Sequence, residues 1–185
     1  MSKSHGICPW QAGSMLTGSL RKAVHNPHQI IKPYLSVGMT AMDVGCGMGF
    51  FSIPMASIVG SSGKVIAVDL QREMLQGLLK YISKEHIQNI TTHQCRNNSL
   101  AIEKWDGAVD FAVLFWMLHE VPDKERLIKE LYDALIPNGR FLFVEPNFHV
   151  SAKNFSASLS IMESLGFTPV EKPKIAISRS ALLQK

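Results

Sequence analysis

Three glycines and one aspartate carry the clearest chemical signal in this 185-residue sequence. Gly45, Gly47 and Gly49 follow an apolar segment, and Asp69 ends the next apolar segment, twenty residues after Gly49. Glycine lets the backbone turn sharply and approach a ligand closely. An acidic residue at the tip of the following strand can accept hydrogen bonds from the hydroxyls of a ribose. Together these residues predict a pocket for a cofactor that contains adenosine.

The spacing of the glycines separates this pocket from two common phosphate sites. A dinucleotide site has a third glycine three residues after the second, where a helix holds the pyrophosphate, but Phe50 occupies that position. A phosphate-binding loop ends in Gly-Lys-Ser or Gly-Lys-Thr, whereas Gly49 is followed by Phe-Phe-Ser. We therefore expect a cofactor without phosphates, and a nucleotide-dependent oxidoreductase is the less favoured alternative.

The elements that must position these residues alternate between strands and helices after residue 38. Apolar runs predict strands at 40–44, 65–69, 90–94, 110–115, 140–145, 167–170 and 181–184. Helical patterns lie at 50–59, 123–136 and 152–165, and around the apolar stripe of Met74, Leu75, Leu78, Leu79 and Ile82. This order predicts an α/β fold with a single doubly wound, mostly parallel seven-stranded sheet, helices on both faces and an antiparallel last strand.

Boundary residues refine this prediction. Gly60 is a helix stop, and Asp123 is a good N-cap for the helix that follows it. The sequence Pro-Asn-Gly at 137–139 is expected to end that helix. Residues 39–185 are expected to form the cofactor-binding domain. Residues 1–38, with a predicted helix over 15–24, precede the first strand and are expected to form an arm or a lid.

Composition narrows the class of protein. Apolar residues make up 46% of the chain, as in globular proteins. The longest apolar run, residues 111–118, is far shorter than the roughly 20 residues that cross a bilayer. A charge of +4 without a basic cluster does not favour nucleic acid binding. Three cysteines without a paired spacing favour neither disulfides nor a zinc site. We expect a cytoplasmic protein with no membrane or nucleic acid partner.

From about residue 38 onward, the chain resembles the class I S-adenosylmethionine-dependent methyltransferases. The resemblance rests on Asp-Val-Gly-Cys-Gly-Met-Gly at 43–49, Val-Ile-Ala-Val-Asp at 65–69, and the stretches 110–119 and 135–145. It is greatest for the branch of small-molecule enzymes that includes the ubiquinone and menaquinone biosynthesis methyltransferases. It implies S-adenosylmethionine as cofactor, with binding residues at Asp43, Gly45, Cys46, Gly47, Gly49, Phe50, Asp69, Leu70, Met74, Arg96, Asn97 and Phe115.

One position departs from the family pattern. The family often has an acidic residue just after the third strand, where it meets the adenine amino group, but Arg96 lies there in this chain. Arginine has hydrogen-bond donors only, so it cannot accept from an amino group. Asn97 or a backbone carbonyl is left to do so, and Arg96 is left to stack on the purine.

Polar residues after the fourth and fifth strands are candidates for the chemistry of methyl transfer. Ligands of open α/β sheets bind at the carboxyl ends of the strands, where His119, Glu145 and His149 are expected. Histidine titrates near neutral pH and can act as a base, so His119 is the first catalytic candidate and Glu145 the second. The alternatives are that His119 anchors its loop and that Glu145 caps a helix or pairs with a cation. No metal site is expected.

The partner molecule is expected to be a small-molecule acceptor. We expect no appended substrate domain, and the pocket roof is then expected to come from residues 1–38, from the loop after the fourth strand, or from the partner in a homodimer. A noncatalytic, methyltransferase-like binding subunit is the main alternative function.

Overall fold

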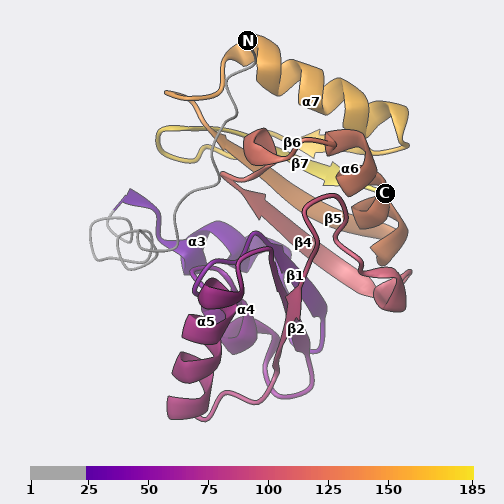
Figure 1. The fold of residues 1–185 in the computed structure, drawn as a ribbon. Coiled ribbons are helices and arrows are strands. Elements are labelled where there is room, and N and C mark those ends of the chain that lie inside the picture. The colour runs from indigo at the N-terminus through magenta and orange to yellow at the C-terminus, as the bar shows by residue number, and fades with distance from the viewer. Residues whose placement is uncertain (1–23) are drawn as a thin grey trace.

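A computed structural model describes residues 24–185, which form a sheet with helices against both of its faces (Figure 1). The seven strands lie in the order β3-β2-β1-β4-β5-β7-β6. They are β1 (Thr40–Val44), β2 (Lys64–Asp69), β3 (Ile90–Gln94), β4 (Val109–Phe115), β5 (Leu135–Pro146), β6 (Thr168–Glu171) and β7 (Ser178–Gln184). The helices are α3 (Pro27–Ile31), α4 (Ser52–Val59), α5 (Arg72–Lys84), α6 (Lys124–Ala134) and α7 (Ala152–Ser164), with 3-10 turns η2 (Lys32–Tyr34), η3 (Glu103–Trp105) and η4 (Leu118–Glu120). The predicted α/β fold is confirmed.

The order of the strands reverses at β1. The chain runs outward from β1 through β2 to β3, and then returns to pair β4 with the other edge of β1. All of these pairs are parallel, so their carboxyl ends lie at one edge of the sheet. In open α/β sheets the crevice at such a reversal is where ligands bind.

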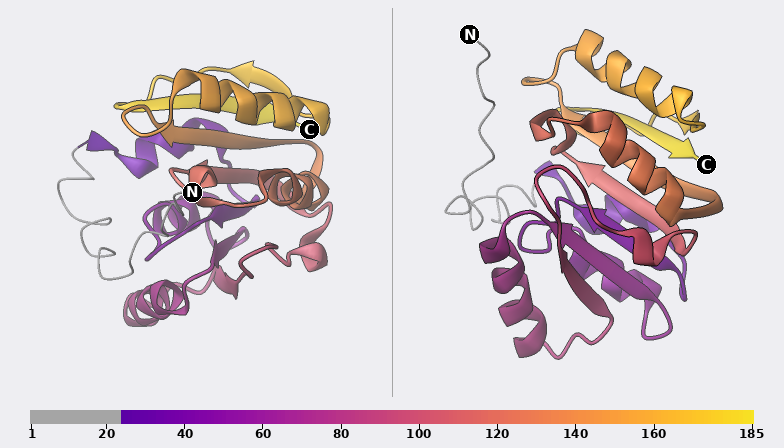
Figure 2. Two further views of the ribbon diagram at one scale, coloured as in Figure 1. Left: turned by 45° about the horizontal axis from the view of Figure 1, so that its top comes forward. Right: turned by 45° about the vertical axis from the view of Figure 1, so that its right-hand side comes forward.

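Helices cover both faces of the sheet (Figure 2). The apolar residues of α6 and α7 pack with Met42, Ala112 and Phe143 on one face. Those of α4 and α5 pack with Ala41, Val113 and the rest of the other face. Because strand residues alternate between the two faces, the apolar run of β4 is buried on both sides, as predicted for a central parallel strand.

The apolar stripe of α5 packs on the sheet as predicted, with one exception. Met74, Leu75, Leu78 and Ile82 are buried, but Leu79 is 45% exposed. Residue 79 lies one position beyond Leu78, about 100° further round the helix, and this turns its side chain toward solvent.

The last strand is antiparallel, as predicted, but its place in the sheet is not that of the chain order. β7 pairs antiparallel with both β5 and β6 and lies between them. β6 is therefore the edge strand, although it precedes β7 in the sequence.

The boundary between α6 and β5 differs from the prediction. The helix ends at Ala134, before Pro-Asn-Gly at 137–139, which lies inside β5. Leu135 already pairs with Val109 of β4, and the register then shifts before Phe111 pairs with Arg140. The backbone bonds from Lys185 N to Gly139 O (2.9 Å) and from Asn138 N to Lys185 O (3.2 Å) extend the pairing with β7. The turn signal thus marks an irregularity in a strand instead of a helix end.

Part of the predicted arm, residues 24–38, packs into the domain. Ile31, Tyr34 and Leu35 belong to the buried cluster on the face covered by α4 and α5, and Tyr34 stacks on Phe111 at 5.8 Å. The rest of that segment, including most of the helix predicted over 15–24, lies outside the described residues. Among the helices of residues 24–185, none is long and apolar enough to cross a bilayer.

Candidate functional site

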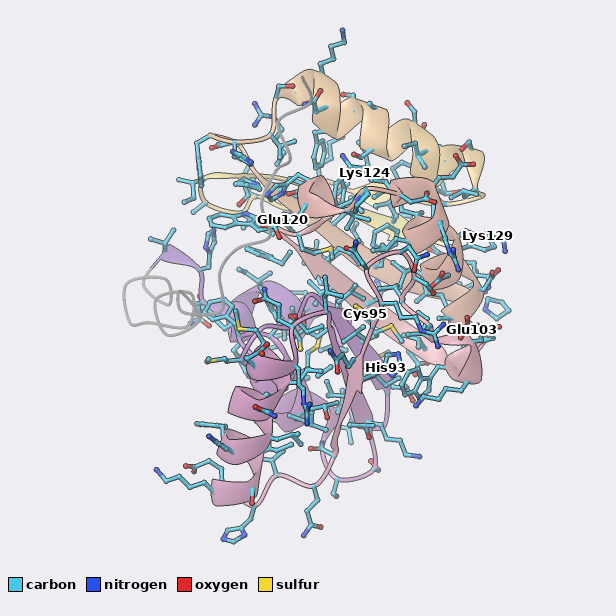
Figure 3. The ribbon with its side chains drawn as sticks, in the orientation of Figure 1. His93, Cys95, Glu103, Glu120, Lys124 and Lys129 are labelled. Atoms are coloured by element: carbon cyan, nitrogen blue, oxygen red, sulfur yellow. The ribbon has the colours of Figure 1, made fainter. Side chains whose placement is uncertain are left out.

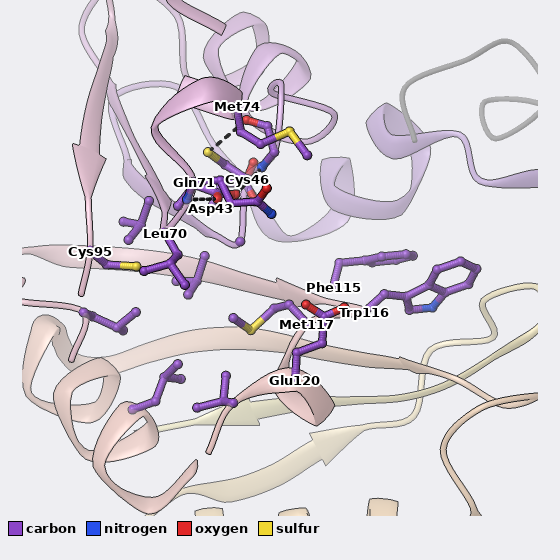
Figure 4. Close-up of a pocket in the computed structure, with 18 of the residues that line it drawn as sticks. Asp43, Cys46, Leu70, Gln71, Met74, Cys95, Phe115, Trp116, Met117 and Glu120 are labelled. Atoms are coloured by element: carbon purple, nitrogen blue, oxygen red, sulfur yellow. Dashed lines mark hydrogen bonds between the residues drawn. The ribbon is translucent and has the colours of Figure 1, made fainter. Parts of the chain in front are cut away.

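A cavity of about 440 Å³ opens at the carboxyl ends of the strands, within the range of small-molecule sites. Loops that follow β1, β2, β3, β4 and β5 line it, so it lies at the reversal of strand order. Figure 4 shows its span, from Cys95 after β3 to Trp116 and Glu120 after β4. The predicted cofactor residues that line it are Asp43, Gly45, Cys46, Gly47, Phe50, Asp69, Leu70, Met74, Arg96, Asn97 and Phe115.

Two of the three glycines in the loop after β1 have backbone conformations that other residues rarely adopt and also line the cavity. Gly45 has φ +77° and Gly47 has φ +54°. A Cβ at Gly45 would lie 2.9 Å from Cγ of Met117, whereas a Cβ at Gly47 would meet no protein atom within 4 Å. Gly47 therefore presents bare backbone to open space in the cavity, as a close-fitting ligand requires.

The third glycine of this loop is needed for packing. Gly49 does not line the cavity. A Cβ there would lie 2.5 Å from Cδ1 of Leu78 and 3.3 Å from Cδ1 of Ile53. Its missing side chain lets α5 pack against the loop.

Asp43 fixes the start of the same loop to the helix that follows it. Its carboxylate is 2% exposed and accepts a hydrogen bond from the Ser52 hydroxyl at 2.6 Å. Ser52 is the first residue of α4. Pro54 lies in the first turn of this helix, where its missing N–H is tolerated.

Asp69 connects the glycine loop to the end of β2. Oδ2 accepts from the backbone N–H of Gly47 at 2.8 Å, and Oδ1 accepts from that of Gln71 at 2.8 Å. Burial raises the pKa of this carboxyl above its usual range, while the backbone donors act in the opposite direction. The backbone N–H of Leu70 is a third donor to this carboxylate. Since a carboxylate has about four acceptor positions, one remains for a ligand hydroxyl.

The loop after β3 forms the far wall of the cavity. Arg96 and Ser99 pair through their backbones, with Arg96 N donating to Ser99 O at 2.8 Å. Cys95 N donates to the carbonyl of Asp69 at 3.0 Å, which places this loop next to the acid at the end of β2. Arg96 and Asn97 are exposed, and both line the cavity.

The two cysteines of the described chain both line the cavity as neutral thiols. Burial raises the pKa of Cys95 to about 11, and it raises that of Cys46 well above its usual range. Thiols of this kind are poor nucleophiles and poor metal ligands. Within residues 24–185, no group of three or more His, Cys, Asp or Glu side chains is arranged to hold a metal ion.

His119 and Glu145, from the ends of β4 and β5, form a hydrogen-bonded pair. Oε2 of Glu145 lies 2.6 Å from Nδ1 of His119, and Oε1 accepts from the His119 backbone N–H at 2.9 Å. Glu145 is 2% exposed and does not line the cavity, while His119 does. Since a carboxylate only accepts, the pair places the proton on Nδ1 and leaves the Nε2 lone pair to act as an acceptor.

Two further ionisable side chains surround the same imidazole. Nε2 of His119 lies 3.9 Å from Oε1 of Glu120. The ring of His149 lies 4.9 Å from that of His119. All three line the cavity near Trp116, whose ring contacts that of Phe148 at 5.6 Å. This end of the cavity combines an imidazole with apolar aromatic walls.

Several cavity residues gave no signal in the sequence. Gln71, Leu100 and Phe148 line the cavity, but nothing in their types or spacing marks them. The period-2 and period-3.6 patterns report burial and not proximity to a ligand. A topological rule could have pointed to Phe148, because it follows a strand at the edge of the sheet where ligands bind.

Comparison with known proteins decides the class. The profile of a family described as a methyltransferase domain matches residues 35–173. The chain belongs to this methyltransferase domain family. Demethylmenaquinone methyltransferases are similar to it: that of Oceanobacillus iheyensis is 30% identical over 114 residues, which are 60% of this chain and 46% of the relative. That of Lactococcus lactis is 32% identical over 108 residues, 58% of this chain and 42% of the relative.

The methyltransferase thus matches less than half the length of these curated relatives. Its fold is shared over nearly the whole chain by a solved protein. The S-adenosylmethionine-dependent methyltransferase from Aquifex aeolicus superposes with a TM-score of 0.85 and 21% identity, covering 96% of this chain and 99% of that one. The family confirms the predicted methyltransferase class, and the fold is that of this solved S-adenosylmethionine-dependent enzyme.

The residues of the cavity fit that cofactor. The open space over Gly47 accommodates a ligand at the β1 loop, and the Asp69 carboxylate retains an acceptor position beside it. Phe50 occupies the position at which a dinucleotide site has its third glycine.

Proposed function

We propose that this methyltransferase transfers the methyl group of S-adenosylmethionine to a small, largely apolar molecule whose nucleophilic atom carries a proton at neutral pH. When bound, the cofactor supplies an electrophilic methyl group on a positively charged sulfur. The chain supplies alignment of the partners and a base. Alignment alone contributes up to about 7–11 kcal/mol to such reactions.

The pairing of His119 with Glu145 carries this proposal. A base is needed only where the acceptor atom is protonated, so a histidine held in one tautomer by a buried carboxylate favours an acceptor of that kind. Glu145 and Glu120 lie on opposite sides of the imidazole, and their negative charges would stabilise the imidazolium that forms when Nε2 takes the proton. Glu145 acts in this scheme as a positioning residue.

The walls around His119 support an apolar acceptor. Phe115, Trp116 and Met117 line the cavity directly before the turn that carries His119. Phe148 lies at the same end and is 71% exposed. The activity of the similar proteins, methylation of demethylmenaquinone, is in keeping with a flat apolar acceptor and gives the first compounds to test.

The experiment is a screen of acceptors with methyl-labelled S-adenosylmethionine, led by quinols and phenols. Label transfer by the wild-type chain is expected, and it should fall by about 10²–10⁴-fold in His119→Ala. Affinity for S-adenosylhomocysteine should be unchanged in that variant. His28→Ala is the control, because His28 is exposed and lies outside the cavity.

The screen also separates the two other functions. A noncatalytic binding subunit would bind S-adenosylhomocysteine but transfer no label to any acceptor class. An oxidoreductase would bind a nicotinamide cofactor instead. Full turnover of His119→Ala on a true acceptor would remove the base from the mechanism and leave alignment alone.

A further inference from the structure

We propose that Glu130, on α6 and outside the cavity, is a positioning residue for cofactor binding because it holds the loop after β3 in its binding shape. This inference rests on the proposed function, since it assumes that the cavity binds S-adenosylmethionine. The loop comprises residues 95–101.

The loop lies where the purine of the cofactor is expected. Five consecutive residues from Arg96 to Leu100 line the cavity. The backbone bond from Cys95 N to Asp69 O joins the loop to the residue expected to bind ribose. A ligand that extends from Gly47 past Asp69 and onward in the direction of β3 reaches this loop with its base.

Glu130 makes two hydrogen bonds to this loop and one within α6. Its Oε2 accepts from the backbone N–H groups of Leu100 at 2.6 Å and Ala101 at 3.1 Å. Its Oε1 accepts from Nε of Arg126 at 3.1 Å. The Glu130 side chain is 15% exposed, and its two bonds to the loop backbone are partly buried. Bonds to a charged acceptor are about twice as strong as neutral ones.

A second side chain holds the same point from β3. Nε2 of His93 lies 2.9 Å from the carbonyl oxygen of Leu100. Figure 3 labels His93, on β3, and Cys95, directly after the end of that strand. Leu100 is 2% exposed and packs in the apolar cluster beneath α6. The backbone N–H of Leu100 is thus bound by a side chain from α6, and its carbonyl by a side chain from β3.

The backbone at this point needs such support. Ala101 has φ +51°, which residues other than glycine rarely adopt. Its N–H is shared between Glu130 and the Ser99 hydroxyl at 3.0 Å. A conformation of this kind persists only where its surroundings impose it. Without Glu130, the loop would have several shapes in the free chain, and binding would have to select one.

The test is calorimetric titration of the full chain with S-adenosylhomocysteine and with 5′-methylthioadenosine, which lacks the amino acid part. Ordering a single loop residue costs about a factor of 10 in affinity. Glu130→Ala should therefore raise the Kd of both ligands by about 10-fold or more, and by the same factor. Glu130→Gln keeps an acceptor oxygen and should restore most of the affinity.

Asp133→Ala is the matched control. Asp133 lies on the same helix and loses a similar bond, its pair with Lys129 at 2.5 Å, but it does not contact the loop through its side chain. The Kd of Asp133→Ala for both ligands should equal that of the wild type. Thermal unfolding of every variant identifies a loss of stability alone, which would lower the melting temperature and leave Kd unchanged.

Three outcomes overturn the inference. Glu130→Ala with wild-type Kd values would show that the loop needs no anchor. A loss for S-adenosylhomocysteine without a loss for 5′-methylthioadenosine would place the effect away from the purine. Failure of the wild-type chain to bind either ligand would overturn the proposed function first, and the inference with it.

Discussion

Exchanging each of two glycines for alanine tests whether the cofactor lies against the loop after β1. Gly47 and Gly49 both have positive φ angles, +54° and +90°, so an alanine at either position should cost about 1–2 kcal/mol of stability. They differ in what the new methyl group meets. At Gly47 it meets no protein atom within 4 Å, and at Gly49 it meets Leu78 at 2.5 Å.

We therefore expect the change at Gly47 to act mainly on cofactor affinity and the change at Gly49 mainly on stability. Gly47→Ala should lose only the stability that the positive φ angle costs an alanine, but its methyl group takes space that the bound cofactor needs. Overpacking of that kind costs about 1–3 kcal/mol, which corresponds to a Kd raised by about 5- to 150-fold. Gly49→Ala should lose about 2–5 kcal/mol of stability, the sum of the backbone and overpacking terms, because Leu78 is fully buried. Its affinity should change less.

The assay is urea unfolding together with titration of S-adenosylhomocysteine. Both variants should remain folded, since domains of this size are usually stable by about 5–15 kcal/mol. Wild-type affinity in Gly47→Ala would refute the placement of the cofactor. Equal losses of affinity in the two variants would refute the distinction drawn between a ligand-facing and a packing glycine.

Three other changes are expected to act as follows. Asp69→Ala should weaken S-adenosylhomocysteine binding by about 1.5–3 kcal/mol and also lower stability by about 1–3 kcal/mol in urea unfolding, because Gly47 N–H loses its acceptor; unchanged affinity would make Asp69 purely structural. Glu145→Gln presents an amide N–H to Nδ1 and should lower turnover by up to about 10⁴-fold by favouring the other tautomer of His119, whereas a wild-type pH–rate profile would argue against a positioning role. The Cys95 pKa of about 11 against an ordinary 9.0 means that the folded chain keeps a proton that the unfolded chain releases, so stability should fall as pH rises from 9.0 to about 11. The free energy of unfolding should fall less over this pH range in Cys95→Ala than in the wild type. If urea unfolding gives the same dependence on pH for both, the shift in the Cys95 pKa is contradicted.

Local features of the fold were predictable because each depends on neighbours in the sequence. Asp123 caps α6 by accepting from the Arg126 N–H at 3.0 Å, as its type and position indicate. Gly60 ends α4 with φ +69°. The position of β7 was not predictable in this way, because a strand pairs with whichever edge is free. Pro-Asn-Gly at 137–139 misled because the same residues serve turns and strand irregularities.

In the candidate site, too, contacts within a sequence motif were predictable and contacts between distant segments were not. Gly47 and Asp69 were predicted to lie together because a motif fixes their spacing, and the structure brings them into contact. The pairing of His119 with Glu145 spans 26 residues, and that of Glu130 with Leu100 spans 30. No periodicity connects such partners. Their contacts follow from the order of the strands and from the packing of α6, which only the tertiary structure supplies.

The insertion of β7 between β5 and β6 has a consequence for biosynthesis. While the chain emerges from the ribosome, β5 keeps one unpaired edge until Ser178–Gln184 is available to cover it. β6 cannot join the sheet earlier, since β7 is its only partner strand within residues 24–185. At about 5–20 residues per second, the 31 residues between Pro146 and Ser178 leave that edge exposed for a few seconds. An open edge of this kind can pair with other nascent chains, so we expect the yield of folded protein to respond to chaperones that shield exposed strands.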